Sequence, residues 1–179
     1  MILGVVLAGG KSTRFGSDKA LAELDGHTLI ARAVDALSGW CEYVVVAGRA
    51  NAPAPTLPDW PTPDMGPLAG LAAALHLARD EGFEAVLSLG VDSAGLPENL
   101  PEWLGAETPA IAATYIASQP VIGLWPVSTV GAIEAILTGP GRHSMRALAE
   151  AVGARAVNLP ALPANINTAA DLAALQRES

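Results

Sequence analysis

The sequence predicts a three-layer α/β/α sandwich around a mostly parallel sheet. Two observations lead to this fold class. Short apolar runs rich in β-branched residues are bounded by Gly, Asp or Ser, which is typical of strands buried on both faces of a parallel sheet. Longer segments with apolar residues at helical spacing lie between these runs, and the β-α-β-α-β order predicts right-handed crossovers. We expect a single domain over residues 1–179, because this length suits one compact core.

The first half of the chain has the clearest pattern. Three strands and two helices are predicted there, in the order Ile2–Leu7, 27–37, Tyr43–Ala47, 68–79 and 85–89. Residues 48–67 contain six prolines, which predicts an irregular loop, and a loop of this length in a compact domain is often functional. A second loop, 90–101, directly follows a predicted strand, where open α/β sheets bind ligands.

The second half is less regular. We predict strands, helices and a last strand, in the order 110–115, 120–124, 127–137, 143–152 and 154–158. A turn at Ser118-Gln119 separates the first two strands, and Gly139-Pro140-Gly141 ends the first of the helices. Thr168 is predicted to cap a final helix, with Asp171 in the place where Glu or Gln usually completes a capping box.

Charge and composition restrict the classes of function. The formal net charge is -8, so we expect no nucleic-acid partner. The chain has only ten Lys and Arg, yet Lys11, Arg14 and Lys19 fall close together, which indicates a local site for a small anion. Cys41 is the only cysteine, which suits a reducing compartment. No apolar run approaches the ~18 residues of a membrane span, so we expect a cytoplasmic protein without a membrane partner.

A glycine-rich segment follows the first predicted strand. It reads Leu7-Ala8-Gly9-Gly10-Lys11-Ser12-Thr13-Arg14-Phe15-Gly16-Ser17-Asp18-Lys19. Gly9 and Gly10 allow backbone N–H groups to approach an anion closely, and Arg14 and Lys19 can neutralise phosphate charge. Neither the P-loop pattern nor the dinucleotide fingerprint is present. From these residues alone, a phosphate-binding loop and a plain strand-to-helix loop with basic surface residues both remain open.

The complete segment resembles the L-A-G-G-x-S-x-R-[MF]-G-x-D-K signature of the nucleotidyltransferase superfamily. Within that superfamily, the chain is most similar to the molybdenum cofactor guanylyltransferases, over nearly its whole length. Further matching blocks follow in order, at 20–26, at Asp59 with 66–70, at Asp92 with Leu96-Pro97, at 120–125 and at 165–168. The resemblance implies a Rossmann-like fold of the nucleotide-diphospho-sugar transferase type.

The resemblance also implies roles for individual residues. Lys19, Arg14 and Asp92 would be catalytic, and Asp92 would hold Mg²⁺, with Mn²⁺ as the alternative. The residues implied to bind the nucleotide or the second substrate are Leu7, Ala8, Gly9, Gly10, Lys19, Asp59, Gly66, Asn165 and Asn167. Asp59 and Gly66 would lie near the guanosine, and Asn165 and Asn167 near the metal or the second substrate.

Structural interpretations of the same residues also remain open. Asp92 suits a loop position that caps a helix, Asp59 a solvated loop, and Asn165 a turn at a helix entry. The loop around Asp92 also departs from the family pattern Cys-Asp-x-Pro-x-Leu-Pro. Ala94 stands in place of the first of the two prolines in this pattern, so we expect a more flexible loop and leave its metal affinity open.

The resemblance implies that the protein transfers GMP from GTP to molybdenum-bound molybdopterin and releases pyrophosphate. GTP and molybdopterin would then be its ligands, and cofactor-handling proteins its protein partners. Three alternatives remain: a cytidylyltransferase of the same cofactor, another small nucleotidyltransferase such as a sugar-phosphate enzyme, and a non-catalytic protein that only binds a nucleotide.

Overall fold

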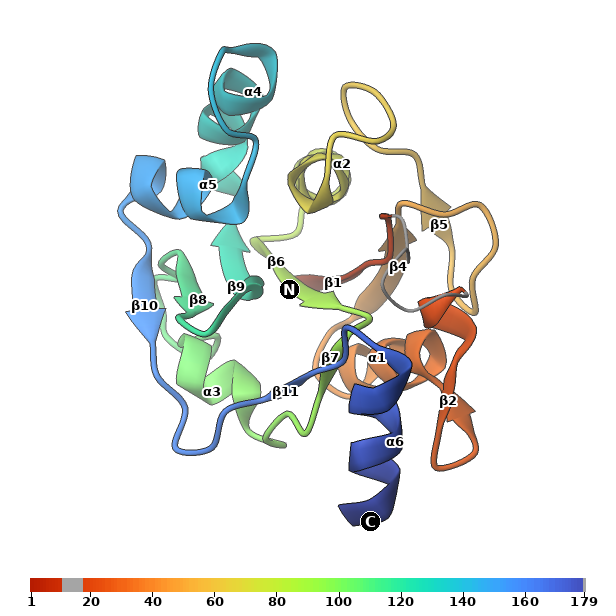
Figure 1. Cartoon of the computed structure of the whole chain (residues 1–179). Coiled ribbons are helices and arrows are strands. Elements are labelled where there is room, and N and C mark those ends of the chain that lie inside the picture. Colours follow the sequence, from red (N-terminus) through yellow and green to blue (C-terminus); the bar gives the residue numbers. More distant parts are fainter. Residues whose placement is uncertain (11–17, 179) are drawn as a thin grey trace.

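A central sheet lies between two layers of helices (Figure 1). The computed structural model describes residues 1–10 and 18–178. Within these residues the central sheet has seven strands, in the order β10-β8-β9-β6-β1-β4-β5. Two small two-stranded sheets, β2-β3 and β7-β11, lie beside it. This arrangement confirms the predicted three-layer α/β/α architecture.

The bounds of the elements follow the chain. The strands are β1 Ile2–Leu7, β2 Glu23–Leu24, β3 His27–Thr28, β4 Tyr43–Ala47, β5 Thr56–Leu57, β6 Ala85–Gly90, β7 Ser93–Ala94, β8 Thr114–Ile116, β9 Gln119–Pro126, β10 Arg155–Val157 and β11 Ala164–Asn165. The helices are α1 Leu29–Ser38, α2 Pro67–Glu81, α3 Leu100–Leu104, α4 Val130–Thr138, α5 Met145–Val152 and α6 Ala169–Glu178. Two short 3-10 helices are η1 Lys19–Leu21 and η2 Val127–Thr129.

The central strands bring three loops to one edge of the sheet. β1 pairs in parallel with both β4 and β6, so that Leu7 lies opposite Ala47 on one side and Gly90 on the other. All three strands therefore end at the same level. Of the described strands in this sheet, only β9 runs in the opposite direction, antiparallel to both β6 and β8. The loops that follow β1, β4 and β6 consequently meet at the carboxyl ends of these strands.

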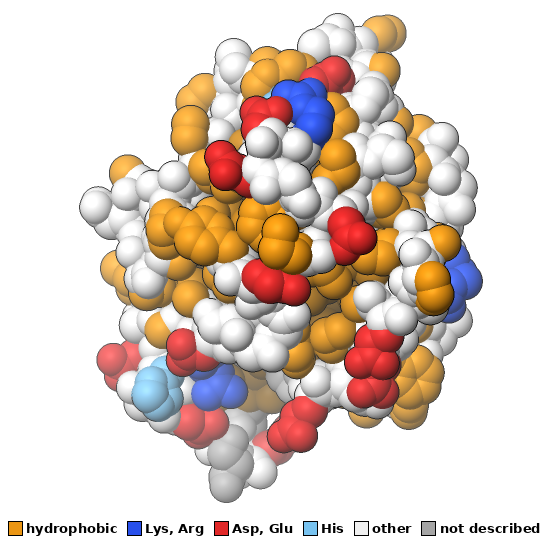
Figure 2. All heavy atoms as spheres, turned by 180° about the vertical axis from the view of Figure 1, so that it is seen from behind, with side chains coloured by type: hydrophobic (Ala, Val, Ile, Leu, Met, Phe, Trp, Pro, Cys, Tyr) orange, Lys and Arg blue, Asp and Glu red, His pale blue; other side chains and the backbone are white. Residues whose placement is uncertain are grey.

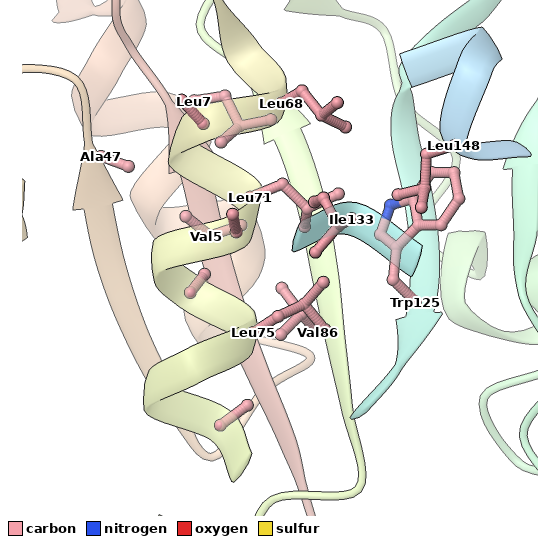
Figure 3. Packing of buried hydrophobic residues seen from close by; sticks show 14 of the residues in the cluster. Val5, Leu7, Ala47, Leu68, Leu71, Leu75, Val86, Trp125, Ile133 and Leu148 are labelled. Atoms are coloured by element: carbon pink, nitrogen blue, oxygen red, sulfur yellow. The ribbon is translucent and has the colours of Figure 1, made fainter. Parts of the chain in front are cut away.

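Helices cover both faces of the sheet. In Figure 1, α2, α4 and α5 lie on one face, while α1 and α3 lie on the other. The core under α2 is drawn in Figure 3, where Leu68, Leu71 and Leu75 point from the helix towards β1, β6 and α4. Trp125 of β9 is fully buried at the side of this cluster. Burial of this apolar layer fixes α2 over the strands whose ends form the site.

Several predicted boundaries need correction, because local hydrogen bonds compete with the periodic pattern. The helix predicted from residue 27 begins at Leu29, since His27 and Thr28 pair with β2 and Thr28 Oγ1 accepts from Ala31 N at 3.2 Å as the helix cap. The loop predicted over 48–67 contains β5, which adds to β4. The strand predicted over 110–115 begins at Thr114, because Thr108 holds the preceding residues in a turn.

The entry to the last helix agrees with its prediction. Thr168 Oγ1 accepts from Asp171 N at 3.1 Å, and Asp171 Oδ2 accepts from Thr168 N at 2.9 Å. This reciprocal pair is a capping box in which Asp replaces the usual Glu or Gln. The box therefore fixes the start of α6, which follows β11 after a short connection.

The surface reflects the acidic composition. Acidic side chains are spread over the face drawn in Figure 2, and basic side chains are fewer there. Among the helices that the structure describes, none has the length and apolar character needed to span a membrane.

Candidate functional site

Two glycines bring the loops after β1 and β4 into direct contact. Gly48 has a φ of +91°, and a Cβ atom on it would lie 2.4 Å from the backbone nitrogen of Gly9. Ala8 N donates to Ala47 O at 2.9 Å, which extends the strand pairing up to this contact. A side chain at position 48 would therefore force the two loops apart.

A cleft opens beyond this contact. It encloses about 660 Å³ between the loop after β1, the proline-rich loop and the start of α2. Its walls are formed by Gly9, Gly10, Gly48, Arg49, Ala50, Thr56, Leu57, Pro58, Asp59, Pro63, Asp64 and Gly66. Mostly apolar walls with a few polar groups are typical of small-molecule sites, and the size suits a nucleoside.

Asp59 is a half-buried acidic residue in the wall of this cleft. Its Oδ1 atom is enclosed, and among the described residues it has no hydrogen-bond partner. The carboxylate lies beside Gly70 of α2, where a Cβ atom would approach Oδ1 to 3.5 Å. Burial, and then the negative charge of Asp64, raise the pKa of Asp59. A carboxylate whose enclosed oxygen lacks a partner would be stabilised by an N–H donor that reaches it.

A second, smaller cavity lies on the other side of the glycine pair. It encloses about 120 Å³, and Gly9 and Gly10 line it as well as the larger cleft. Lys19 Nζ lies 3.5 Å from Asp92 Oδ2 in its wall. Lys19 begins η1, which Asp18 caps by accepting from Ala20 N at 3.2 Å. A cation and a carboxylate thus face each other next to a backbone that can approach an anion closely.

The position of Asp92 depends on the end of β6. The carboxylate folds back over Gly90, where a Cβ atom would lie 2.6 Å from Asp92 Oδ1. Asp92 O also accepts from Ile166 N at 2.8 Å, and Asn165 pairs with Ser93 across β7 and β11. Ala94, which replaces the proline of the family pattern, is buried within this pairing. The segment with Asn165 and Asn167 therefore lies directly beside Asp92.

The residues around Asp92 suit a magnesium ion shared with a substrate. Mg²⁺ keeps several waters and is usually held by one or two carboxylates together with substrate phosphates. The side chain of Asp92 is 28% exposed and borders the smaller cavity. Within residues 1–10 and 18–178, no group of three His, Cys, Asp or Glu side chains gathers to hold a metal by itself. The donor set thus fits a metal that binds together with a nucleotide.

The structure brings most of the residues singled out in the sequence to one place. Those around the smaller cavity are Leu7, Ala8, Gly9, Gly10, Lys19 and Asp92. Asp59 and Gly66 line the larger cleft, and Asn165 joins Asp92 through β11. Arg14 lies outside the described residues. The sequence reasoning missed Arg49, although a basic residue directly after a glycine at a strand end is a signal that it could have used.

Comparisons with known proteins agree with this geometry. The family described as "MobA-like NTP transferase domain" matches residues 4–157. A molybdenum cofactor guanylyltransferase from Rhodobacter capsulatus is 39% identical over 178 residues, which cover 96% of this chain and 93% of that protein. The chain belongs to the MobA-like NTP transferase family. It is accordingly a nucleotidyltransferase, and its predicted resemblance to the molybdenum cofactor guanylyltransferases is confirmed.

Solved structures support the family fold. The molybdopterin-guanine dinucleotide biosynthesis protein A of Archaeoglobus fulgidus superposes with a TM-score of 0.73 at 20% identity, over 99% of this chain and 98% of that one. A nucleotidyl transferase from Methanothermobacter gives a TM-score of 0.75 at 17% identity, over 99% and 97% of the two chains. At these identities the likeness concerns the fold, which is that of the MobA-like family.

Proposed function

We propose that this nucleotidyltransferase transfers GMP from GTP to molybdenum-bound molybdopterin, which forms the guanine dinucleotide cofactor and releases pyrophosphate. The observation that carries the proposal is the pair of cavities joined at Gly9 and Gly10. One has the size of a nucleoside and contains the half-buried carboxylate of Asp59. The other contains a lysine and a carboxylate that suit a triphosphate with its metal. We infer the acceptor, molybdopterin, from the names of the relatives, which are molybdenum cofactor guanylyltransferases.

The larger cleft holds the guanosine in this proposal. Guanine has two adjacent donors on one edge, N1–H and N2–H₂, and a carboxylate can accept from both. Adenine, cytosine and uracil each place an acceptor beside their donor on that edge, so they would repel one of the carboxylate oxygens. Asp59 is the residue of the cleft with an enclosed oxygen that lacks a partner among the described residues. We therefore assign it to base recognition.

The triphosphate crosses the glycine pair into the smaller cavity. We expect backbone N–H groups at Gly9 and Gly10 to donate to phosphate oxygens, and the Lys19 ammonium to neutralise the charge that builds on them in the transition state. Asp92 would hold Mg²⁺, which would supply further neutralisation of the phosphate oxygens. Asp92 and Lys19 also keep each other in place across 3.5 Å before a nucleotide binds.

The acceptor approaches from the side of β11. A phosphate oxygen of molybdopterin attacks the α-phosphorus of GTP, the bond to the β,γ-diphosphate breaks, and pyrophosphate leaves. Because a phosphate nucleophile is already ionised near pH 7, the reaction requires no protein general base. Asn165 and Asn167, beside Asp92, supply amide groups for contacts with this second substrate.

The choice of donor is tested by pyrophosphate release with each of GTP, CTP, ATP and UTP, in the presence of Mg²⁺ and molybdenum-loaded acceptor. We expect turnover with GTP and little with the other three. Equal use of CTP would contradict the guanylyl assignment. Tight nucleotide binding without turnover of any donor would contradict catalysis of this reaction.

The role of Lys19 has its own test. Lys19→Ala removes the ammonium group beside the triphosphate, so we expect transfer to fall by roughly 10²-fold or more. The fold should persist, because the side chain lies at the edge of a cavity and outside the apolar core. Circular dichroism and the pyrophosphate assay are measured on the same sample. A folded Lys19→Ala protein with full activity would show that the lysine does not act on the nucleotide.

A further inference from the structure

Arg49 makes the most complete side-chain ion pair in the described part of the site. Its Nη1 donates to Asp18 Oδ1 at 3.2 Å and its Nη2 to Asp18 Oδ2 at 3.0 Å. Its Nε donates to Asn51 O at 2.9 Å. The Arg49 side chain is only 18% exposed. The Asp18 side chain is 50% exposed, so the bidentate geometry and the shielded arginine, more than burial of the pair, hold both partners in one arrangement.

Asp18 transmits this geometry to Lys19. The same carboxylate that binds Arg49 caps η1 by accepting from Ala20 N, and η1 begins at Lys19. Rotation of Asp18 would therefore release the cap and shift the backbone that carries Lys19. Lys19 is the residue that faces Asp92 in the smaller cavity. Arg49, which is 31 residues from Asp18 in the sequence, thus influences the position of Lys19 through this ion pair.

The preceding residue strengthens this connection. Gly48 packs against Gly9, while Arg49 binds Asp18. The dipeptide Gly48-Arg49 therefore touches the glycine-rich segment on both sides of residues 11–17. The dipeptide directly follows β4, whose residues Val44 to Ala47 are buried in the sheet. The buried strand therefore fixes the position of the Gly48-Arg49 backbone.

We propose that Arg49 is a positioning residue for the nucleotidyl transfer, which fixes the phosphate-binding Lys19 through Asp18. Three of its five N–H donors are already engaged by Asp18 and Asn51, and these bonds hold the guanidinium against the residue that precedes Lys19. This role rests on nucleotidyl transfer itself and is independent of which nucleotide is the donor.

A double-mutant cycle tests the connection to Asp18. We expect Arg49→Ala and Asp18→Ala each to lower kcat/KM on the order of tenfold, and the double variant to lose no more than either single variant. Additive losses would show that Arg49 contacts the nucleotide by itself and would overturn the proposal. Unchanged kcat/KM for Arg49→Ala would overturn it as well. Arg79→Ala, which removes an exposed arginine paired with Asp80 on α2, is the matched control and should keep full activity.

Donor binding separates positioning from a general structural effect. By calorimetry, Arg49→Ala should weaken binding of the nucleoside triphosphate in the otherwise wild-type protein and have no further effect in the Lys19→Ala background. Equal weakening in both backgrounds would overturn the proposal, because the arginine would then act independently of Lys19. The assays use whichever triphosphate the wild-type protein turns over. A donor other than GTP would contradict the guanylyl assignment and leave this test intact.

Discussion

At the scale of single residues, the Asp59 carboxylate costs stability, and our proposal gives it a role in binding. Its carboxylate is half-buried beside α2, and burial together with Asp64 raises its pKa. Ionisation at neutral pH therefore works against folding. A ligand that donates to this carboxylate would offset the lost hydration, which is the role that our proposal gives to the base.

Asp59→Asn should therefore raise thermal stability at pH 7 and weaken GTP binding. Because the pKa in the folded protein is above that of the unfolded chain, the stabilisation linked to protonation is present at low pH and is lost as the pH rises through the raised pKa. The difference in Tm between variant and wild type should grow from about pH 4 to pH 7. It should stay small, since solvent screens a half-exposed group.

Asp35→Asn is the matched control for this measurement, because it neutralises an exposed carboxylate on α1. It should leave GTP binding unchanged and produce no comparable trend with pH. If Asp59→Asn were less stable than the wild type at pH 7, the carboxylate would have a stabilising partner and its assignment to base recognition would lose its basis.

At the scale of an element, the end of β6 determines where Asp92 lies. Gly90 is the last residue of the strand, and its missing side chain leaves the space into which the carboxylate folds. β7 and β11 then hold the next residues by backbone pairing, so that Asp92 is enclosed between two ordered segments. The strand end thus positions the metal-binding carboxylate of our proposal.

Gly90→Ala should displace Asp92 without unfolding the protein. The new Cβ would lie 2.6 Å from Asp92 Oδ1, and the flexible end of that side chain can move away. We expect a fall in kcat on the order of tenfold with little change in Tm, measured by pyrophosphate release and thermal denaturation. The matched control is Gly131→Ala, since Gly131 lies in α4 with open space around it.

The control should keep full activity and gain roughly 0.5–1 kcal/mol in the free energy of unfolding, because alanine is the better helix former. Full activity of Gly90→Ala would mean that the position of Asp92 relative to β6 does not matter for transfer.

At the scale of the whole molecule, Trp125 joins the two halves of the sheet. It is 0% exposed, and its Nε1 donates to Ser88 Oγ of β6 at 3.0 Å. Ser88 Oγ in turn donates to Val121 O of β9 at 2.7 Å. The indole lies over Gly123, and Figure 3 shows it close to Ile133 and Leu148. One side chain thus connects the central strands with the helices of the second half.

Trp125→Phe should lower the free energy of unfolding by roughly 2 kcal/mol, because it leaves a cavity and removes the donor to Ser88. Urea denaturation measures this change. Trp103→Phe, at a side chain that is 38% exposed, should change stability by less than about 0.5 kcal/mol. Equal losses for the two variants would show that the buried contacts of Trp125 do not stabilise the fold.

The sequence alone determined the elements whose signals are local. Continuous apolar runs predicted β1 and β4 with their observed bounds, because strands buried on both faces tolerate little else. Thr168 and Asp171 predicted the start of α6, since a cap needs only its own turn. Ordered motifs predicted the family and most of the residues gathered around the two cavities.

Only the tertiary structure decided how distant segments meet. The antiparallel direction of β9 and the enclosure of the Asp59 oxygen depend on packing between residues far apart in the chain. The backbone pairing of Asn165 with Ser93 also does, although the resemblance had already implied that Asn165 lies near the metal or the second substrate. The ion pair between Arg49 and Asp18 belongs to the same group. Side-chain patterns report which face of an element is buried, but they do not identify its neighbour, because many partners can bury the same apolar face.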